Sequence, residues 1–430
     1  MPRLHRNVIT QHAASPYGLA TISLGIFLAA WLFPPALYTE YATEPDLMYL
    51  DPQSMYLFLA CLAAFCSGLL TYRVIFPPQL RISSVAVSRP LEFLAVPLLV
   101  ATFACLGYLV IIGREIDFWG LLLSQQGNAI KAATHSGGDN TDGVWVHTLL
   151  WLTGTLWWAA FRARQLRPSR TAFRVVFTFG LVVDMLTCSA KVSRGALMPL
   201  VIGLACIYIY HGATSENVRS LRIALLGAGS GIALVLLFLL FSFFRGANST
   251  RSFVITLLGY SIASYNRMAA ILAGVMHYQY AGRGVYLFPV LVENTSLSNF
   301  MAGHFGWPTY FLIWQSEFLS VHAAGLNKAF IWSGVFGYVY SDLGWFAPLY
   351  IFFTGLVVAW FWSLFQRGQT LGIVIYPWLA YWILFWSGSN VILDFHVIEL
   401  AVLPLSIGFY EFLFFRPAKV AVQDWVAPVS

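Results

Sequence analysis

Residues 345–366 read WFAPLYIFFTGLVVAWFWSLFQ, a run without a single charged side chain. A helix rises about 1.5 Å per residue, so a run of this length can cross the ~30 Å of hydrocarbon in a lipid bilayer. Continuous apolar character on every face is typical of a helix that is surrounded by lipid or by other apolar helices. The run therefore predicts a membrane-spanning helix.

The composition of the whole chain supports the same interpretation. Of the 430 residues, 10% are charged and 59% are hydrophobic, whereas a soluble chain carries roughly 25% charged residues. Too few polar side chains are present to cover a soluble protein of this size. The basic residues are scattered between apolar runs and form no single face for nucleic acid. We therefore expect an all-α polytopic membrane protein without a nucleic-acid partner.

Apolar runs long enough to span a bilayer occur about ten times along the sequence. They lie at about 17–38, 53–72, 91–113, 144–161, 171–190, 195–211, 223–244, 345–366, 371–388 and 396–415. Residues 253–276 are also apolar but carry Tyr, Ser, Asn and Arg side chains, which favours a helix in the membrane interface. A further pair of spans within 253–340 is an alternative that preserves every orientation.

Charge divides the turns between the spans into two sets. With the N-terminus inside, 15 of the 24 Lys and Arg residues lie on the inner side, while acids such as Glu40, Glu44 and Asp117 collect outside. The positive-inside rule then predicts that both termini are cytoplasmic. The chain divides into seven spans (1–244), a large external segment with interfacial helices (245–344), and three spans with a cytoplasmic tail (345–430).

The external side nevertheless holds seven basic residues after span five, against the insertion bias. They are Lys191, Arg194, Arg245, Arg251, Arg267, Arg283 and Lys328. Arginine donates two parallel hydrogen bonds to phosphate oxygens and stays charged in a partly dry site. Anchoring of helix ends by snorkelling arginines is the alternative explanation for each position.

The sequence contains no motif for a metal site, a nucleotide-phosphate site or a serine nucleophile. The five cysteines all lie in apolar runs, which indicates neither a disulfide framework nor a zinc site. We find no nucleotide-phosphate loop, no His-Glu-x-x-His, no Asp-x-Asp pair and no Gly-x-Ser-x-Gly elbow. The segment Gly282-Arg283-Gly284 is interpreted as a turn. We therefore expect no cofactor and no metal.

Two short motifs resemble a known family. Residues 191–197, KVSRGAL, are similar to the Ser-Arg-Gly signature of bacterial O-antigen and oligosaccharide repeat-unit polymerases. Residues 337–345, GYVYSDLGW, resemble the family's tyrosine, aspartate, aromatic and glycine entry to a late helix, with Leu343 in place of the usual aromatic residue. The resemblance extends to the layout of ten or more spans with a large external segment in the second half.

The resemblance implies a glycosyltransferase with a GT-C-like fold in the bacterial inner membrane. Such polymerases join repeat units carried on undecaprenyl diphosphate at the periplasmic face, and build O-antigen of lipopolysaccharide or a related surface polysaccharide. The implied partners are the lipid-linked glycan donor and acceptor, the bilayer, and a membrane protein that regulates chain length.

The reaction needs cations for the departing diphosphate and a base for the acceptor hydroxyl. The candidate diphosphate-binding residues are Arg194, Arg245, Arg251, Arg267 and Arg283, and the transfer is expected to be metal-independent. The candidate catalytic residues are His304, His322, Glu317 and Asp342. A solvated loop histidine and a helix-capping aspartate are the alternatives for the histidines and Asp342.

Two other functions remain open from the sequence. An O-antigen ligase would use the same lipid-linked donor but transfer the glycan to the lipopolysaccharide core. A flippase or transporter of polyprenyl-linked sugars would concentrate polar groups at mid-membrane, often in internal repeats, and we find no clear repeat. The Asp342 motif favours the polymerase.

Overall fold

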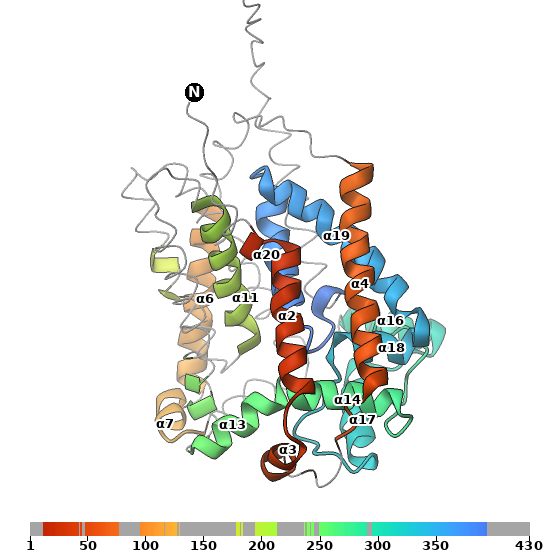
Figure 1. Ribbon diagram of the computed structural model, residues 1–430. Coiled ribbons are helices and arrows are strands. Elements are labelled where there is room, and N and C mark those ends of the chain that lie inside the picture. The colour runs from red at the N-terminus through yellow and green to blue at the C-terminus, as the bar shows by residue number, and fades with distance from the viewer. Residues whose placement is uncertain are drawn as a thin grey trace, which may run out of the picture.

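The structure, a computed structural model, describes residues 12–42, 44, 48–76, 95–115, 117–126, 129, 178–180, 182–183, 194–212, 236, 239–240, 242–244, 249–289 and 295–393. Within these residues every regular element is a helix, which confirms the predicted all-α class (Figure 1). The helices are α2 (Pro16–Trp31), α3 (Pro35–Ala42), α4 (Pro52–Ile75), α6 (Ala95–Glu115), α7 (Phe118–Leu123), α11 (Arg194–Ile207), α13 (Thr250–Gly259), α14 (Ile262–Leu272), α16 (Thr295–Phe305), α17 (Tyr310–Ala323), α18 (Gly334–Leu343), α19 (Ala347–Gln366) and α20 (Thr370–Leu384).

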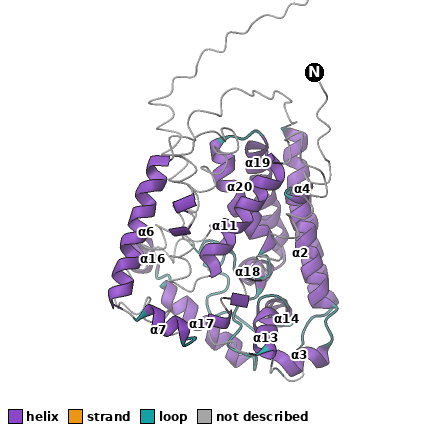
Figure 2. Ribbon diagram, turned by 90° about the vertical axis from the view of Figure 1, so that its left-hand side faces the viewer, coloured by secondary structure: helices purple, strands orange, loops and turns teal. Residues whose placement is uncertain are grey.

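The helices have two main directions. In Figures 1 and 2, α2, α4, α6 and α11 stand upright, whereas α3, α13 and α14 lie across the lower end of this bundle. The helix α17 lies toward the same end, which we call the lower end. The turn between α19 and α20 lies at the opposite, upper end.

Local sequence explains where two of these helices begin. Pro52 occupies the first turn of α4, and the side chain of Asp51 accepts a hydrogen bond from the Ser54 N–H at 2.9 Å. At α13, Ser249 accepts from the Ser252 N–H at 3.2 Å in the same way. In both cases the third helical residue returns a side-chain bond to the capping residue, which completes a capping box.

Two stretches of the described chain are long and apolar enough to cross a membrane. They are Pro52–Ile75 and Gly334–Gln366, and α2 with α3 forms a third if the bent pair is counted as one span. Shorter apolar helices lie at Thr102–Ile111, Met198–Tyr210, Thr250–Gly259 and Leu371–Leu384. Large apolar side chains such as Leu70, Phe353 and Trp360 point outward from the spans. These surfaces indicate a membrane protein.

Most predicted spans within the described residues correspond to a helix. The runs at 53–72, 195–211 and 371–388 coincide with α4, α11 and α20, and 91–113 with α6. The runs at 144–161 and 396–415 lie outside the described residues, as do most of 171–190 and 223–244. The total of ten spans therefore stays a prediction.

The first predicted span, 17–38, is divided between two helices with a sharp bend between them. The helix α2 ends at Trp31, and α3 starts at Pro35 with a bend of 89° between the two. The sequence Phe33-Pro34-Pro35 causes this break, because proline lacks an N–H donor and disfavours helical geometry in the residue before it. As a result α3 lies across the lower end (Figure 1).

Span eight starts earlier than the sequence predicted. The apolar stretch begins at Gly334, so the last part of the predicted external segment 245–344 belongs to this candidate span. A 3₁₀ turn, Gly344–Phe346, joins α18 to α19, and Gly344 there has φ +55°. Since a positive φ strains other residues, glycine permits this junction.

The interfacial helix predicted over 253–276 is also different in the structure. Residues 262–271 of α14 are all buried, and this helix packs against α2, α4 and α18. Its polar side chains Ser264, Asn266 and Arg267 point into the protein instead of toward lipid headgroups. Those polar residues were the reason for predicting an interface, but inside the protein they find hydrogen-bond partners.

Glycines allow the two clearest spans to approach closely. A Cβ atom on Gly68 of α4 would overlap the carbonyl oxygen of Phe352, and one on Gly355 of α19 would overlap the carbonyl oxygen of Phe65. Small residues at such crossings are the usual means by which apolar helices pack in a membrane. Gly355, which the sequence placed in a late span, therefore has a packing role.

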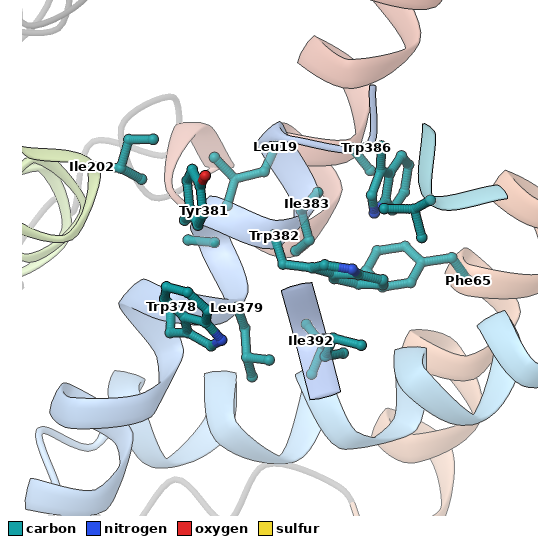
Figure 3. Close-up of a cluster of buried hydrophobic side chains, with 14 of the residues drawn as sticks. Leu19, Phe65, Ile202, Trp378, Leu379, Tyr381, Trp382, Ile383, Trp386 and Ile392 are labelled. Carbon is teal, nitrogen blue, oxygen red and sulfur yellow. The ribbon is translucent and has the colours of Figure 1, made fainter. Parts of the chain in front are cut away.

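An aromatic core fills the space between α4, α20 and their neighbours (Figure 3). The ring centroids of Phe65 and Trp386 are 5.2 Å apart in an edge-to-face arrangement, and Trp382 lies 5.9 Å from Trp386. Each of these side chains is fully buried. Their ring contacts connect α4 with the end of α20 and the residues that follow it.

Candidate functional site

The first polar centre at the lower end is a buried ion pair. The carboxylate of Glu44 contacts the guanidinium of Arg267, and both side chains have no exposed surface. Glu44 also accepts from the Tyr38 hydroxyl and, at 2.6 Å, from the Asn327 N–H. The pair joins the segment after α3 to α14 and to the turn before α18.

Arg267 uses all of its donors inside the protein. Besides Glu44, it donates to the Tyr38 hydroxyl at 3.3 Å and to the carbonyl oxygens of Ala263, Asn327 and Phe330. A guanidinium has five N–H groups, and these five bonds use them all. From the sequence, Arg267 was a candidate diphosphate ligand. In the structure its donors are already bound to groups inside the protein, so we omit Arg267 from the candidate phosphate site.

A cluster of three tyrosines lies next to this ion pair. The ring centroids of Tyr278, Tyr286 and Tyr338 are 5.0, 5.3 and 5.5 Å apart in pairs, and all three side chains are buried. Burial raises the pKa of Tyr278 and Tyr286 far above the ordinary range, and the nearby Glu317 carboxylate adds to both shifts. These hydroxyls therefore stay protonated and can act as hydrogen-bond donors, not as bases.

Glu317 lies on the buried face of α17. Its neighbours on that face, Ile313 and Val321, pack with Tyr278, Tyr286 and Tyr338 in one hydrophobic cluster. Glu317 itself is 9% exposed, so its carboxylate is largely shielded from water. A shielded carboxylate can accept a proton if a substrate reaches it.

Asp342 holds a loop. One of its carboxylate oxygens accepts from the N–H groups of Gly282 at 2.9 Å and Gly284 at 3.2 Å. The other accepts from Tyr286 at 2.9 Å and Leu287 at 3.1 Å. The turn predicted at Gly282–Gly284 is therefore confirmed. Asp342 does not cap a helix, because its carboxylate binds the N–H groups of this loop.

Two candidate arginines are exposed at the surface. Arg283 lies on the loop that Asp342 holds, with its guanidinium 5.6 Å from the centroid of the Tyr280 ring. Arg251, in the first turn of α13, donates to the carbonyl oxygen of Glu40 at 3.0 Å. Both guanidinium groups keep donors that a bound anion could use.

The two histidines are exposed near helix ends. His304 lies in the last turn of α16, where its Nδ1 is 3.0 Å from the Phe300 carbonyl oxygen and its ring stacks on Phe300. His322 lies in the last turn of α17. Neither histidine is buried, so a substrate can reach both rings from solvent.

The remaining two arginines are only partly placed. Arg194, a candidate diphosphate ligand next to the predicted span 195–211, is the first residue of α11, but its side chain lies outside the described residues. Arg245 lies outside the described residues altogether. Their predicted contact with a diphosphate stays a prediction.

The structure therefore brings part of the predicted set together. Asp342 accepts from the Tyr286 N–H, and Tyr278 and Tyr286 pack in one cluster with Ile313 and Val321, the residues on either side of Glu317 on the buried face of α17. Arg283 belongs to the same loop. Sequence reasoning did not select the three tyrosines or Glu44 as site residues. Tyr338 lies within the second motif, and Tyr278 and Tyr286 lie in a tyrosine-rich segment between 278 and 286, whereas Glu44 looked like an ordinary acid of a polar turn.

No three His, Cys, Asp or Glu side chains in the described part of the chain are grouped so that they could hold a metal ion. Comparisons with protein-family models, with curated proteins and with solved structures found no match for the chain.

Proposed function

We propose that the protein is a membrane glycosyltransferase that polymerises oligosaccharide repeat units carried on undecaprenyl diphosphate. The two motifs that resemble repeat-unit polymerases support the proposal, together with the apolar helices that indicate a membrane protein. The observation that carries it is that Asp342, the aspartate of the second motif, binds the loop that carries the exposed Arg283.

The proposed reaction moves a glycan from one lipid to another. The acceptor's hydroxyl oxygen attacks the first sugar carbon of the donor glycan, and the bond from that carbon to the diphosphate oxygen breaks. Undecaprenyl diphosphate leaves with the bonding electrons, and a base takes the acceptor proton. Arg283 and Arg251 are the exposed cations for the departing diphosphate, with Arg194 and Arg245 kept as predicted.

The base in this proposal is a residue that can reach the acceptor hydroxyl. His304 and His322 are exposed, and an imidazole nitrogen can accept a proton from a hydroxyl that comes within hydrogen-bond distance. Glu317 is the third candidate because it lies beside the tyrosine cluster. Asp342 is excluded from this role in the proposal, since both of its oxygens already accept two N–H groups.

The proposal places the lower end at the periplasmic face of the inner membrane and both termini in the cytoplasm. We expect a cysteine at Ala323, exposed at the end of α17, to react with an impermeant thiol reagent in intact cells. A cysteine at Gln369, exposed in the turn between α19 and α20, should react only after the cells are opened. Labelling is measured as the increase over the parent chain. Reaction of Gln369→Cys in intact cells would reverse the orientation.

The function itself is tested with purified protein in liposomes and a purified lipid-linked repeat unit. A polymerase gives a ladder of lengthening glycans. A ligase gives product only when lipopolysaccharide core is added, and a flippase moves the labelled lipid across the bilayer without lengthening it. Absence of a ladder with repeat units from several polysaccharides would reject the polymerase.

We further expect one of the histidines to be needed for turnover. Loss of a general base slows a reaction by about 10²–10⁴-fold, so His304→Ala or His322→Ala should show a loss in this range at equal protein amount. His277→Ala is the matched control, because His277 is another exposed histidine of the same part of the chain. Normal ladders from both variants would move the role to Glu317.

A further inference from the structure

The loop between Gly282 and Leu287 has an unusual set of contacts. Gly282 and Gly284 have φ values of +78° and +76°, which turn successive N–H groups toward one point. Four N–H groups converge on the two carboxylate oxygens of Asp342, at distances from 2.9 to 3.2 Å. A carboxylate offers about four lone-pair directions, so these bonds fill them.

Other elements hold the carbonyl side of the same loop. The side-chain amide of Asn390 donates to the Tyr286 carbonyl oxygen at 3.1 Å, and the Tyr350 hydroxyl donates to the Leu287 carbonyl oxygen at 3.4 Å. The Tyr286 ring is buried in the tyrosine cluster. The second half of the loop is thus fixed from several sides. In the first half, Asp342 binds the N–H groups of Gly282 and Gly284, and the Gly284 carbonyl oxygen accepts from the N–H groups of Leu287 and Phe288.

We propose that Asp342 is a positioning residue that fixes the Gly282–Leu287 loop and thereby sets where Arg283 presents its guanidinium. Arg283 lies between the two glycines whose N–H groups Asp342 binds, and its side chain is exposed. The loop geometry stands on its own; the part that assigns Arg283 to a diphosphate rests on the proposed function.

The assignment has a chemical reason. An arginine binds a diphosphate well when its planar fork is held in place before the anion arrives, because less conformational freedom is then lost. Glycine on both sides makes the backbone at Arg283 intrinsically mobile. The Asp342 carboxylate offsets this mobility with four hydrogen bonds to a charged acceptor, which are stronger than bonds between neutral groups.

The loop geometry is tested by proteolysis of the purified full-length protein in nanodiscs. Trypsin cleaves after exposed arginines but needs the local backbone to open. We expect Asp342→Asn, which replaces one accepting oxygen with an N–H donor, to speed cleavage after Arg283 at least about tenfold. Gly282→Ala should act in the same direction through the backbone alone, because its Cβ would meet open space. Mass spectrometry identifies the cleaved bond.

Asp117→Asn is the matched control for this experiment. Asp117 also accepts a backbone N–H of a nearby turn, that of Gly120 at 3.1 Å, but it precedes α7. Cleavage after Arg283 should be unchanged in this variant. Wild-type cleavage rates after Arg283 in both Asp342→Asn and Asp342→Glu, with both variants monodisperse, would overturn the proposal.

The catalytic part is tested in the polymerisation assay. If Asp342 acts through Arg283, Asp342→Asn should lower kcat more than it raises the KM for the lipid-linked donor, as expected for Arg283→Lys, and its residual activity should keep the wild-type pH profile. The double variant with Arg283→Lys should lose little more than Arg283→Lys alone. If the activity of Asp342→Asn no longer fell at low pH as that of the wild type does, Asp342 would instead be the base. Faster cleavage in a protein without any polymerase activity would reject the proposed function while leaving the loop geometry intact.

Discussion

Replacing Glu44 with glutamine is expected to destabilise the folded protein by about 3–5 kcal/mol, because it leaves the buried Arg267 guanidinium without its counter-charge. Both side chains are fully buried, so water cannot compensate the remaining charge. The measurement is the free energy of unfolding in mild detergent, or the temperature at which half of the protein stays monodisperse.

Arg251→Met is the matched control for Glu44→Gln. Arg251 donates to the carbonyl oxygen of Glu40, close in sequence to Glu44, but it is exposed. Its loss should cost no more than about 1 kcal/mol, as is usual for exposed charged side chains. Replacing both buried partners, with Glu44→Gln and Arg267→Met together, should recover part of the loss, since no charge is then buried alone. Equal stability of Glu44→Gln and wild type would contradict the buried ion pair.

The apolar part of this fold was predictable from the sequence because it depends on local composition. A run without charges, such as 53–72 or 371–388, has no other stable environment than lipid or apolar protein, and helices lie at both positions. The break at Pro34 was also readable, since proline acts on its immediate neighbours. We overlooked it because the hydrophobic run continues through the prolines.

The polar part was less predictable because its partners are distant in the sequence. An arginine in an interrupted apolar segment looks the same whether it faces phosphate or a buried carboxylate, and Arg267 meets Glu44 more than 200 residues away. Asp342 is similar, since the loop that it binds lies 55 to 60 residues earlier. The motif around Asp342 was visible in the sequence, whereas the four N–H groups that occupy it appear only in three dimensions.

Arg283→Lys is expected to slow polymer formation about 10²–10³-fold, or by about 2.7–4 kcal/mol in the activation free energy. Lysine keeps the positive charge and a long apolar stem, so it still anchors a loop at a membrane surface. It lacks the planar pair of donors that matches a diphosphate whose charge grows as the glycosyl bond breaks. The measurement is the rate of ladder formation from purified lipid-linked repeat unit at equal protein amount.

Arg367→Lys is the matched control, because it tests whether replacing any exposed arginine with lysine slows polymer formation. Arg367 is exposed at the end of α19, at the upper end of the molecule, and donates to the backbone and side chain of Ser363. Its replacement should leave turnover near the wild-type rate. Arg194→Lys and Arg245→Lys extend the comparison to the two arginines that the sequence alone assigns to the diphosphate. If Arg283→Lys retains normal turnover while either of these loses it, the diphosphate binds at the start of α11 or after 244, and the loop held by Asp342 serves another part of the substrate.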